Sequence, residues 1–400
     1  MEHRGWLAAW PGLCATLVGV GIGRFSYTPL IPFLIADGTL SETEAAYLGA
    51  ASLLGYLVGA TLAAPAAVRF GMSRAVRAAL ILAALSLFAC VPPLGFWWFL
   101  PWRLLSGIAG AILMVLGPSL MLIRTVAGER GRAGGLIYTG VGLGTVIGSL
   151  IVAPLAASAP AYAWAALGLA AALATFASWP GWRDGGPVLR PASSVARARI
   201  APGHLDLALL CLIAAFGADG AGFVPHTIFW VDFITRELAL GAAAGAFNWL
   251  LFGVGAIVGP FAAGLLGDRL GIGAALIVVY ATKAIAVAVP SFLAAPPLLW
   301  LSSFVVGALS PGIASLISAR ISQLVEPARQ APVWALATLV FSLAQAGSAY
   351  AMSFAFARGG RYLPLYAVGG LIEACGMAAC IVAVLTARRH PGKRRGADGR

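Results

Sequence analysis

The sequence predicts an all-helical protein that crosses a membrane about twelve times, in two related halves of six helices. Three observations predict this fold class: an apolar composition, a regular succession of apolar segments, and a match between the two halves of the chain. Hydrophobic residues make up 60% of the 400 residues and charged residues only 10%, whereas soluble domains carry roughly a quarter charged residues. The mean hydropathy is +0.92. The chain is therefore expected to lie in a lipid bilayer.

Apolar segments long enough to span a bilayer follow one another, separated by short stretches rich in proline, glycine and charge. The first six are expected at residues 9–35, 44–67, 75–95, 98–123, 133–157 and 161–180. The second six are expected at residues 205–233, 242–266, 272–293, 297–318, 331–356 and 362–387. Basic, proline-containing residues between the two sets are typical of a solvated linker. The expected parts are an N-terminal half (1–180), a linker (181–203), a C-terminal half (204–387) and a basic tail (388–400).

The positions of the basic residues predict the orientation in the membrane. The net charge is +12, but the basic residues are scattered between apolar segments, unlike the clustered patch that binds nucleic acid. The loops after helices 2 and 4, the linker and the tail are basic, and the first loop is acidic. Because basic loops remain cytoplasmic, both termini are expected in the cytoplasm and the protein in a bacterial inner membrane. Arg358 and Arg361 are exceptions on the expected outer side.

An internal repeat supports the division into halves. Gly55, Gly59, Arg69 and Gly71 recur 200 residues later, and Gly107 recurs with the same offset; the counterparts are Gly255, Gly259, Arg269, Gly271 and Gly307. Arginine followed two residues later by glycine, at the same inner loop of each half, is the most informative match. Parallel six-helix halves with a site between them at the midplane are a known transporter plan.

Several classes of function are disfavoured. The chain has no nucleotide-binding loop, nucleophile elbow or paired catalytic carboxylates on a soluble segment. The five cysteines lie in apolar segments without metal-ligand spacing. The sequence therefore predicts neither an enzyme nor a protein with a cofactor or metal, and it favours a monomer whose partners are a small solute, protons and lipid.

Two motifs resemble those of the major facilitator superfamily. Residues 264–271 (GLLGDRLG) resemble its inner-loop signature, and the first half keeps the arginine and glycine but has Val68 in place of the aspartate. This resemblance implies a gating role for Arg69, Gly71, Asp268, Arg269 and Gly271. Residues 103–111 (RLLSGIAGA) resemble a second motif, in which the arginine, here Arg103, is implied in proton-linked transport.

The resemblance can be narrowed further. Residues 21–32 (GIGRFSYTPLIP) and 225–232 (PHTIFWVD) resemble stretches of the YbfB/YjiJ-type facilitators. The resemblance to this family covers nearly the whole chain. The resemblance implies the fold and a transport function but no particular substrate. Expected helix 5 has the glycines of the antiporter motif but Thr145 where that motif has proline, which disfavours export.

Two expected helices carry charge near the middle of the membrane. Arg24 lies about 15 Å from the outer end of helix 1, where a charge normally faces a partner or a wet cavity. It is interpreted as an anion-binding or gating residue, with a structural ion pair as the alternative. Surrounding glycines and prolines predict a bend or break in both helix 1 and helix 7.

In helix 7, Asp219 and His226 are seven residues apart and so share a face of a continuous helix. Both side-chain types suit a proton site; the alternative is that Asp219 caps a broken helix and His226 bonds a carbonyl. Asp232 is expected to be solvated or to cap a helix. Lys283 and Glu373, on helices 9 and 12, are expected to form a structural ion pair, with a transport role as the alternative.

Aromatic and amide side chains complete the candidate site. Tyr27, Tyr138, Trp230, Asn248 and Gln345 are candidates for substrate contact, packing being the alternative for each. The leading hypothesis is proton-coupled alternating access for a small organic solute, anions being among the candidates, with uptake preferred. The alternatives are proton-antiport export of drugs or metabolites, and a transport-inactive membrane sensor.

Overall fold

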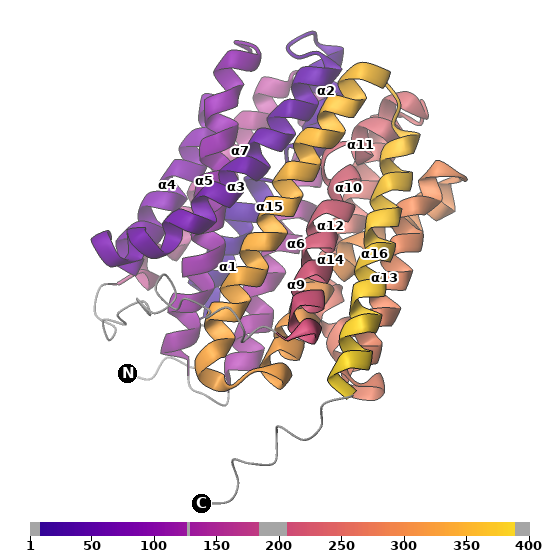
Figure 1. Ribbon diagram of the computed structural model, residues 1–400. Helices are drawn as coiled ribbons and strands as arrows, with labels where there is room; N and C mark the ends of the chain where they lie inside the picture. The colour runs from indigo at the N-terminus through magenta and orange to yellow at the C-terminus, as the bar shows by residue number, and fades with distance from the viewer. Residues whose placement is uncertain (1–8, 126–128, 184–205, 389–400) are drawn as a thin grey trace, which may run out of the picture.

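The computed structural model describes residues 9–125, 129–183 and 206–388, and the regular structure in these residues is helical. Long helices run side by side along the height of the molecule (Figure 1). The predicted linker beyond residue 183 and the predicted tail beyond residue 388 lie outside the described residues.

The long helices occur as two sets of five. The first set is α3 (Glu42–Phe70), α4 (Met72–Ala89), α5 (Phe96–Arg124), α6 (Arg130–Ala156) and α7 (Pro160–Ser178). The second set is α12 (Gly241–Leu270), α13 (Ile272–Ala288), α14 (Pro296–Leu324), α15 (Pro327–Gly359) and α16 (Leu363–Arg388). Single turns of 3-10 helix follow α7 (η5, Trp179–Gly181) and α13 (η7, Val289–Ser291).

The helix that begins each half is broken. The first consists of α1 (Trp10–Thr16), η2 (Leu17–Ile22), η3 (Thr28–Leu30) and α2 (Ile31–Ala36). The seventh consists of α9 (Leu207–Gly222), α10 (Val224–Ile228), α11 (Trp230–Asp232) and η6 (Phe233–Glu237). The breaks predicted from glycine and proline are therefore present within the helices expected at residues 9–35 and 205–233. Proline lacks the backbone N–H that a continuous helix needs.

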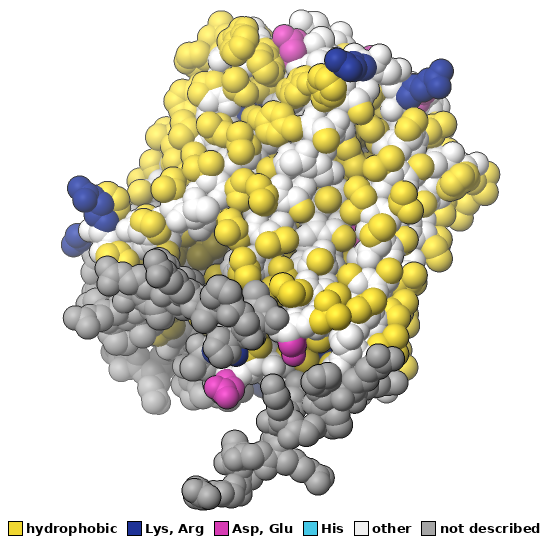
Figure 2. Space-filling view, in the orientation of Figure 1, with side chains coloured by type: hydrophobic (Ala, Val, Ile, Leu, Met, Phe, Trp, Pro, Cys, Tyr) yellow, Lys and Arg dark blue, Asp and Glu magenta, His cyan; other side chains and the backbone are white. Residues whose placement is uncertain are grey.

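Eleven helices in the described residues are long and apolar enough to cross a membrane, and Trp10–Ile22 forms a shorter apolar helix. Hydrophobic side chains are spread over the visible face of the molecule, and Lys and Arg lie at its margins (Figure 2). Exposed rings such as Phe176 (81% exposed) and Phe292 (82% exposed) suit contact with lipid. The predicted fold class is confirmed: the chain is an all-helical, multi-pass membrane protein.

The internal repeat corresponds to repeated packing. A Cβ atom on Gly55 would collide with the backbone of Leu104 in α5, and one on Gly255 would collide with the backbone of Phe304 in α14. Gly71 and Gly271, at the turns that end α3 and α12, have φ values of 86° and 79°, a region that favours glycine. The recurring glycines therefore allow equivalent helix pairs to approach closely and equivalent turns to form.

A substitution series tests this packing. Gly55→Leu and Gly255→Leu are each expected to lower the free energy of unfolding by about 1–3 kcal/mol or more, because the backbone opposite cannot withdraw. Gly264→Leu is the matched control, since open space surrounds its Cβ position. Thermal unfolding of the purified variants measures the effect, and equal melting temperatures for all three would contradict it.

Broken helix 1 contacts both helix 7 and α12 of the other half. The Thr28 hydroxyl donates to the Thr227 carbonyl at 2.5 Å, and Trp249 Nε1 donates to the Phe25 carbonyl at 2.8 Å. Phe25 also packs within an apolar cluster that includes residues of both halves. This contact places backbone carbonyls, and the polar side chains that bond them, in the interior of the bundle.

Candidate functional site

A small cavity lies where broken helices 1 and 7 meet. The first half contributes Arg24, Phe25, Tyr27, Thr28, Gly49, Ser52, Leu53 and Arg103, and the second half contributes Thr227 and Ile228. Its volume of about 10 Å³ for the centre of a water-sized sphere is roughly that of one water site. The cavity therefore has room for about one water molecule, and a larger molecule fits only if its walls move apart.

Two arginines line this cavity in different ways. Arg103, 1% exposed on α5, donates from Nη1 to the Gly23 carbonyl at 3.0 Å, and Ser106 donates to the same oxygen at 3.0 Å. These bonds satisfy a carbonyl freed by the break in helix 1. Arg24 lies within the break, and its Nε and Nη2 are buried without a hydrogen-bond partner among the described residues.

Tyr27 is the other predicted site residue in the cavity wall. Its hydroxyl donates to the Ala45 carbonyl at 2.9 Å, and the Arg103 guanidinium carbon lies 4.4 Å from the centre of its ring. The ring also stacks on Trp164 at 6.3 Å. Tyr27 therefore positions Arg103 and fixes the break.

The second half contains a buried cluster of one cation and two carboxylates, here called the Lys283 triad (Asp219, Lys283 and Glu373). Lys283 Nζ lies 2.5 Å from Asp219 Oδ1 and 3.4 Å from Glu373 Oε1. All three residues are 0% exposed. Lys283 and Glu373 were expected to pair with each other, and the structure adds Asp219 as the nearer partner of the lysine.

The Lys283 triad lies at the break in helix 7. Lys283 Nζ is 4.4 Å from the ring centre of Phe223, the residue at the break. A Cβ on Gly222 would lie 2.7 Å from Glu373 Cγ, so the glutamate packs directly against the backbone that ends α9. Any change in charge or position at Glu373 therefore acts on this break.

The expected contact between Asp219 and His226 is not formed. The seven-residue spacing assumed a continuous helix, and the break at Phe223 interrupts it. His226 Nε2 instead bonds Ser302 Oγ at 2.9 Å. Because Ser302 donates its single hydroxyl hydrogen to the Ala286 carbonyl, His226 Nε2 is the donor in this bond. His226 Nδ1 is buried without a partner in the described part of the chain.

Two predicted substrate contacts belong to a neighbouring network on α14. Trp230 Nε1 donates to Ser303 Oγ at 2.8 Å, and Ser303 donates to Asn248 Oδ1 at 2.8 Å. Trp230 also stacks on His226, with ring centres 4.2 Å apart. These bonds occupy the indole N–H of Trp230 and the amide oxygen of Asn248, and they connect helix 7 to α12 and α14.

The remaining predicted site residues lie elsewhere. Tyr138 is 39% exposed and Gln345 is 1% exposed, and neither is among the residues that line the cavity. Gln345 Nε2 has no hydrogen-bond partner among the described residues. Asp268 and Arg269 are exposed at the end of α12, and the Arg69 guanidinium carbon lies 5.6 Å from the ring centre of Phe70.

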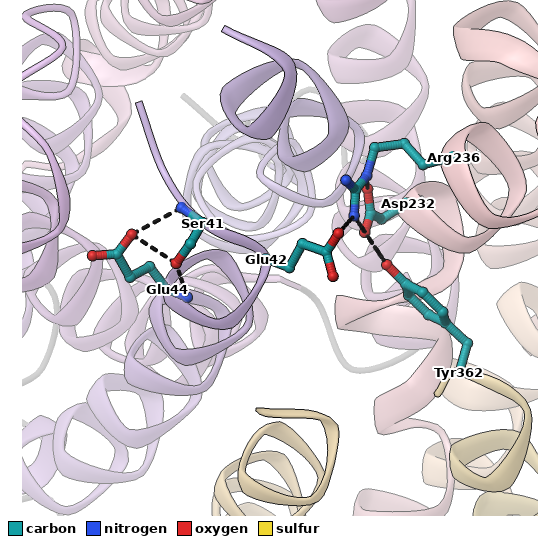
Figure 3. A network of polar contacts seen from close by, with 6 residues as sticks. All are labelled: Ser41, Glu42, Glu44, Asp232, Arg236 and Tyr362. Carbon is teal, nitrogen blue, oxygen red and sulfur yellow. Dashed lines mark hydrogen bonds and ion pairs between the residues drawn. The ribbon is translucent and has the colours of Figure 1, made fainter. Parts of the chain in front are cut away.

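A second ionic cluster joins the halves at the end of the bundle that carries loop 37–41, and we call it the Arg236 cluster (Glu42, Asp232, Arg236 and Tyr362; Figure 3). Arg236 Nη2 lies 2.8 Å from Glu42 Oε1 of the first half. Arg236 Nε donates to Asp232 Oδ1 at 2.6 Å, and Tyr362 donates to Asp232 Oδ2. Asp232, expected to be solvated or to cap a helix, is instead 4% exposed because Arg236 and Tyr362 cover it.

A capping box positions the first-half member of this cluster. Ser41 Oγ accepts from the Glu44 backbone N–H at 3.3 Å, and Glu44 Oε2 accepts from the Ser41 backbone N–H at 2.8 Å (Figure 3). This reciprocal pairing fixes the start of α3. Glu42, the first residue of α3, is thereby directed at Arg236.

Loss of the Arg236 cluster is expected to favour opening of this end. In Arg236→Gln the contact between the halves is lost, and an exposed pair of this kind contributes about 1 kcal/mol or less. The open population should therefore rise up to about fivefold. To measure the open population, Ser52→Cys is introduced into a variant without native cysteines, and an impermeant maleimide is applied from the side of loop 37–41. The labelling rate of this cysteine reports how often the end opens. Arg358→Gln is the control, and equal rates in both variants would contradict the expectation.

Solved structures share this architecture. A D-xylose–proton symporter superposes with a TM-score of 0.72 at 16% identity, over 94% of this chain and 95% of that chain. The inward-open conformation of the xylose transporter XylE from E. coli gives the same values. At this identity the likeness shows that the chain shares the fold of these solved structures.

The chain belongs to the family described as uncharacterised MFS-type transporter YbfB, whose model matches residues 16–384. The resemblance seen in residues 21–32 and 225–232 is thereby confirmed. An MFS-type transporter of Yersinia pestis (strain Pestoides F) is 29% identical over 123 residues, 31% of this chain and 32% of the relative. One of Enterobacter sp. (strain 638) is 25% identical over 126 residues, 32% of this chain and 33% of the relative. The aligned stretches thus span about a third of these curated relatives.

Proposed function

We propose that the protein moves a small organic solute together with protons across the bacterial inner membrane, by alternating access of its two halves. In this proposal residues 1–180 and 204–387 are the moving halves, residues 181–203 are a cytoplasmic linker, and both termini are cytoplasmic. The solute binds where broken helices 1 and 7 meet, and the Lys283 triad carries the proton.

The charge balance of the Lys283 triad is the observation that supports proton coupling. If both carboxylates are ionised, the triad has a net charge of −1 in an interior that excludes water, which is energetically costly. One bound proton makes the triad neutral. Asp219 is the closer partner of Lys283, and neither oxygen of Glu373 has a hydrogen-bond partner among the described residues. Glu373 is therefore the proposed proton carrier.

The position of Glu373 suggests how proton binding acts on the solute site. Glu373 packs against Gly222 at the break in helix 7, and Thr227, a few residues beyond the break, bonds Thr28 of helix 1. The neutral triad favours the closed arrangement of this break. An ionised Glu373 favours an arrangement in which water reaches it, and the wall of the cavity moves with helix 7.

Two observations favour symport over export. The expected antiporter motif of helix 5 has Thr145 in place of proline, and Thr145 donates to the Val141 carbonyl of its own helix at 2.9 Å. The cavity lining is also dominated by small, polar and cationic side chains, which suit a compact polar solute better than a bulky drug.

The test uses proteoliposomes loaded with a fluorescent pH indicator. Monocarboxylates, amino acids and sugars are added outside in turn, and proton entry is recorded with and without an imposed pH gradient. We expect at least one solute class to carry protons inward, and an inward-directed proton gradient to increase its accumulation. Solute flux that neither moves protons nor responds to the gradient would refute proton coupling, and binding without any flux would support the sensor alternative.

A further inference from the structure

The guanidinium of Arg24 presents an unoccupied pair of donors. Its Nε and Nη2 are both buried and have no hydrogen-bond partner among the described residues. These two nitrogens share one edge of the planar guanidinium, so their N–H bonds are parallel. Parallel N–H donors match the two oxygens of a carboxylate in a bidentate pair.

The surroundings hold Arg24 in place without neutralising it. Its guanidinium carbon lies 5.1 Å from the ring centre of Phe25 and 5.4 Å from that of Tyr56. Aromatic rings attract a cation but accept no conventional hydrogen bond. Within the described residues no carboxylate pairs with Arg24 or with Arg103, which lines the same cavity. Two cations that line one cavity form a site for an anion.

A third donor completes the site. Ser52, on α3, lines the cavity, is 2% exposed, and its hydroxyl has no hydrogen-bond partner in the described residues. The other hydroxyls of the lining are already occupied: Tyr27 donates to the Ala45 carbonyl, Thr28 to the Thr227 carbonyl and Thr227 to the Val224 carbonyl. Beside these polar groups lie the apolar side chains of Leu53 and Ile228, which suit an organic group better than a fully hydrated inorganic ion.

We infer that the solute is a small organic carboxylate, with its two oxygens on the Nε–Nη2 edge of Arg24 and a further hydrogen bond from Ser52. Arg103 contributes positive charge while it holds the Gly23 carbonyl. The inference rests on the proposed transport function, because it names the class of solute carried. Its test measures binding and can therefore fail separately from a test of flux.

The experiment is a thermal-shift titration of the purified full-length protein in detergent. Acetate, propionate and benzoate are each compared with the corresponding amide, and with inorganic phosphate and sulfate at equal ionic strength. At least one carboxylate is expected to raise the melting temperature by roughly 2 °C or more when in large excess over its Kd. Its amide is expected to have no effect, because it carries no negative charge.

Variants assign the effect to Arg24. Arg24→Gln is expected to abolish the shift, and Arg24→Lys to weaken binding about tenfold or more, because lysine keeps the charge but loses the two parallel donors. Ser52→Ala should weaken carboxylate binding less than Arg24→Lys does. Arg358→Gln, which removes an exposed arginine at the end of α15, should leave the shift unchanged.

A further measurement does not depend on the choice of probe. Arg24 Nε and Nη2 are buried without a hydrogen-bond partner among the described residues. Removing a cation held in this way for binding should stabilise the protein without ligand, so Arg24→Leu is expected to raise the melting temperature by roughly 2 °C. A large fall in the melting temperature of Arg24→Leu would show a structural arginine and overturn the inference. So would equal shifts with carboxylates and amides, shifts with phosphate or sulfate alone, or carboxylate binding retained in Arg24→Gln. Carboxylate binding with no pH-driven flux would leave this inference standing and remove the proton-coupled function.

Discussion

Lys283→Met is expected to lower the free energy of unfolding by about 3–5 kcal/mol, the usual effect of removing one partner from a buried ionic group. Asp219 and Glu373 would remain buried, and the cation 2.5 Å from Asp219 would be gone. Methionine is close to the lysine stem in volume, so the lost charge rather than a cavity dominates the effect. Thermal unfolding in detergent, followed by size-exclusion chromatography, measures it.

A rescue variant separates charge from packing. Combining Lys283→Met with Asp219→Asn and Glu373→Gln leaves no charge in the triad, and it should recover most of the lost stability. Arg358→Met is the control for loss of a positive charge at an exposed position. A single variant Lys283→Met as stable as the wild type, or a triple variant no more stable than the single one, would contradict the charge-balance argument.

Much of the fold was predictable from the sequence because it depends on local patterns. The breaks in helices 1 and 7 follow from clustered glycine and proline, and the recurrence of Gly55 as Gly255 follows from equivalent close approaches between helices. A bilayer constrains segment length as well, so eleven of the predicted spans could be located from hydropathy alone.

The contacts of the candidate site were less predictable, because they depend on how helices rotate and which neighbours they face. Asp219 was expected to act with His226 on one face, and the break between them gives the two residues different partners. Asp232 and Arg236 are four residues apart, a spacing that indicates a pair on one helix. The contact between Arg236 and Glu42 could not be predicted in this way, because the two residues lie far apart in the sequence. The Nε–Nη2 edge of Arg24, which has no hydrogen-bond partner among the described residues, could not be predicted from the sequence, because it depends on where all neighbouring side chains lie.

The second large effect is expected at Glu373. In Glu373→Gln the triad is neutral without a bound proton, because Asp219 and Lys283 balance each other. Solute exchange across the membrane should therefore continue at a rate within about threefold of the wild type, while accumulation driven by a pH gradient should fall by tenfold or more, the effect of about 1.4 kcal/mol of lost driving force. Counterflow and gradient-driven uptake in proteoliposomes, with the solute found in the binding titration, distinguish these two activities.

Asp219→Asn provides the matched comparison. Lys283 then has Glu373 as its remaining carboxylate partner, 3.4 Å away, and the resulting ion pair holds Glu373 ionised. Gradient-driven uptake should be lost in this variant too, but exchange should also slow, because the ionised Glu373 opposes the closed arrangement of helix 7. Gradient-driven uptake that survives in both variants would exclude the Lys283 triad as the proton site, and His226, whose Nδ1 is buried without a partner among the described residues, would then be the group to test.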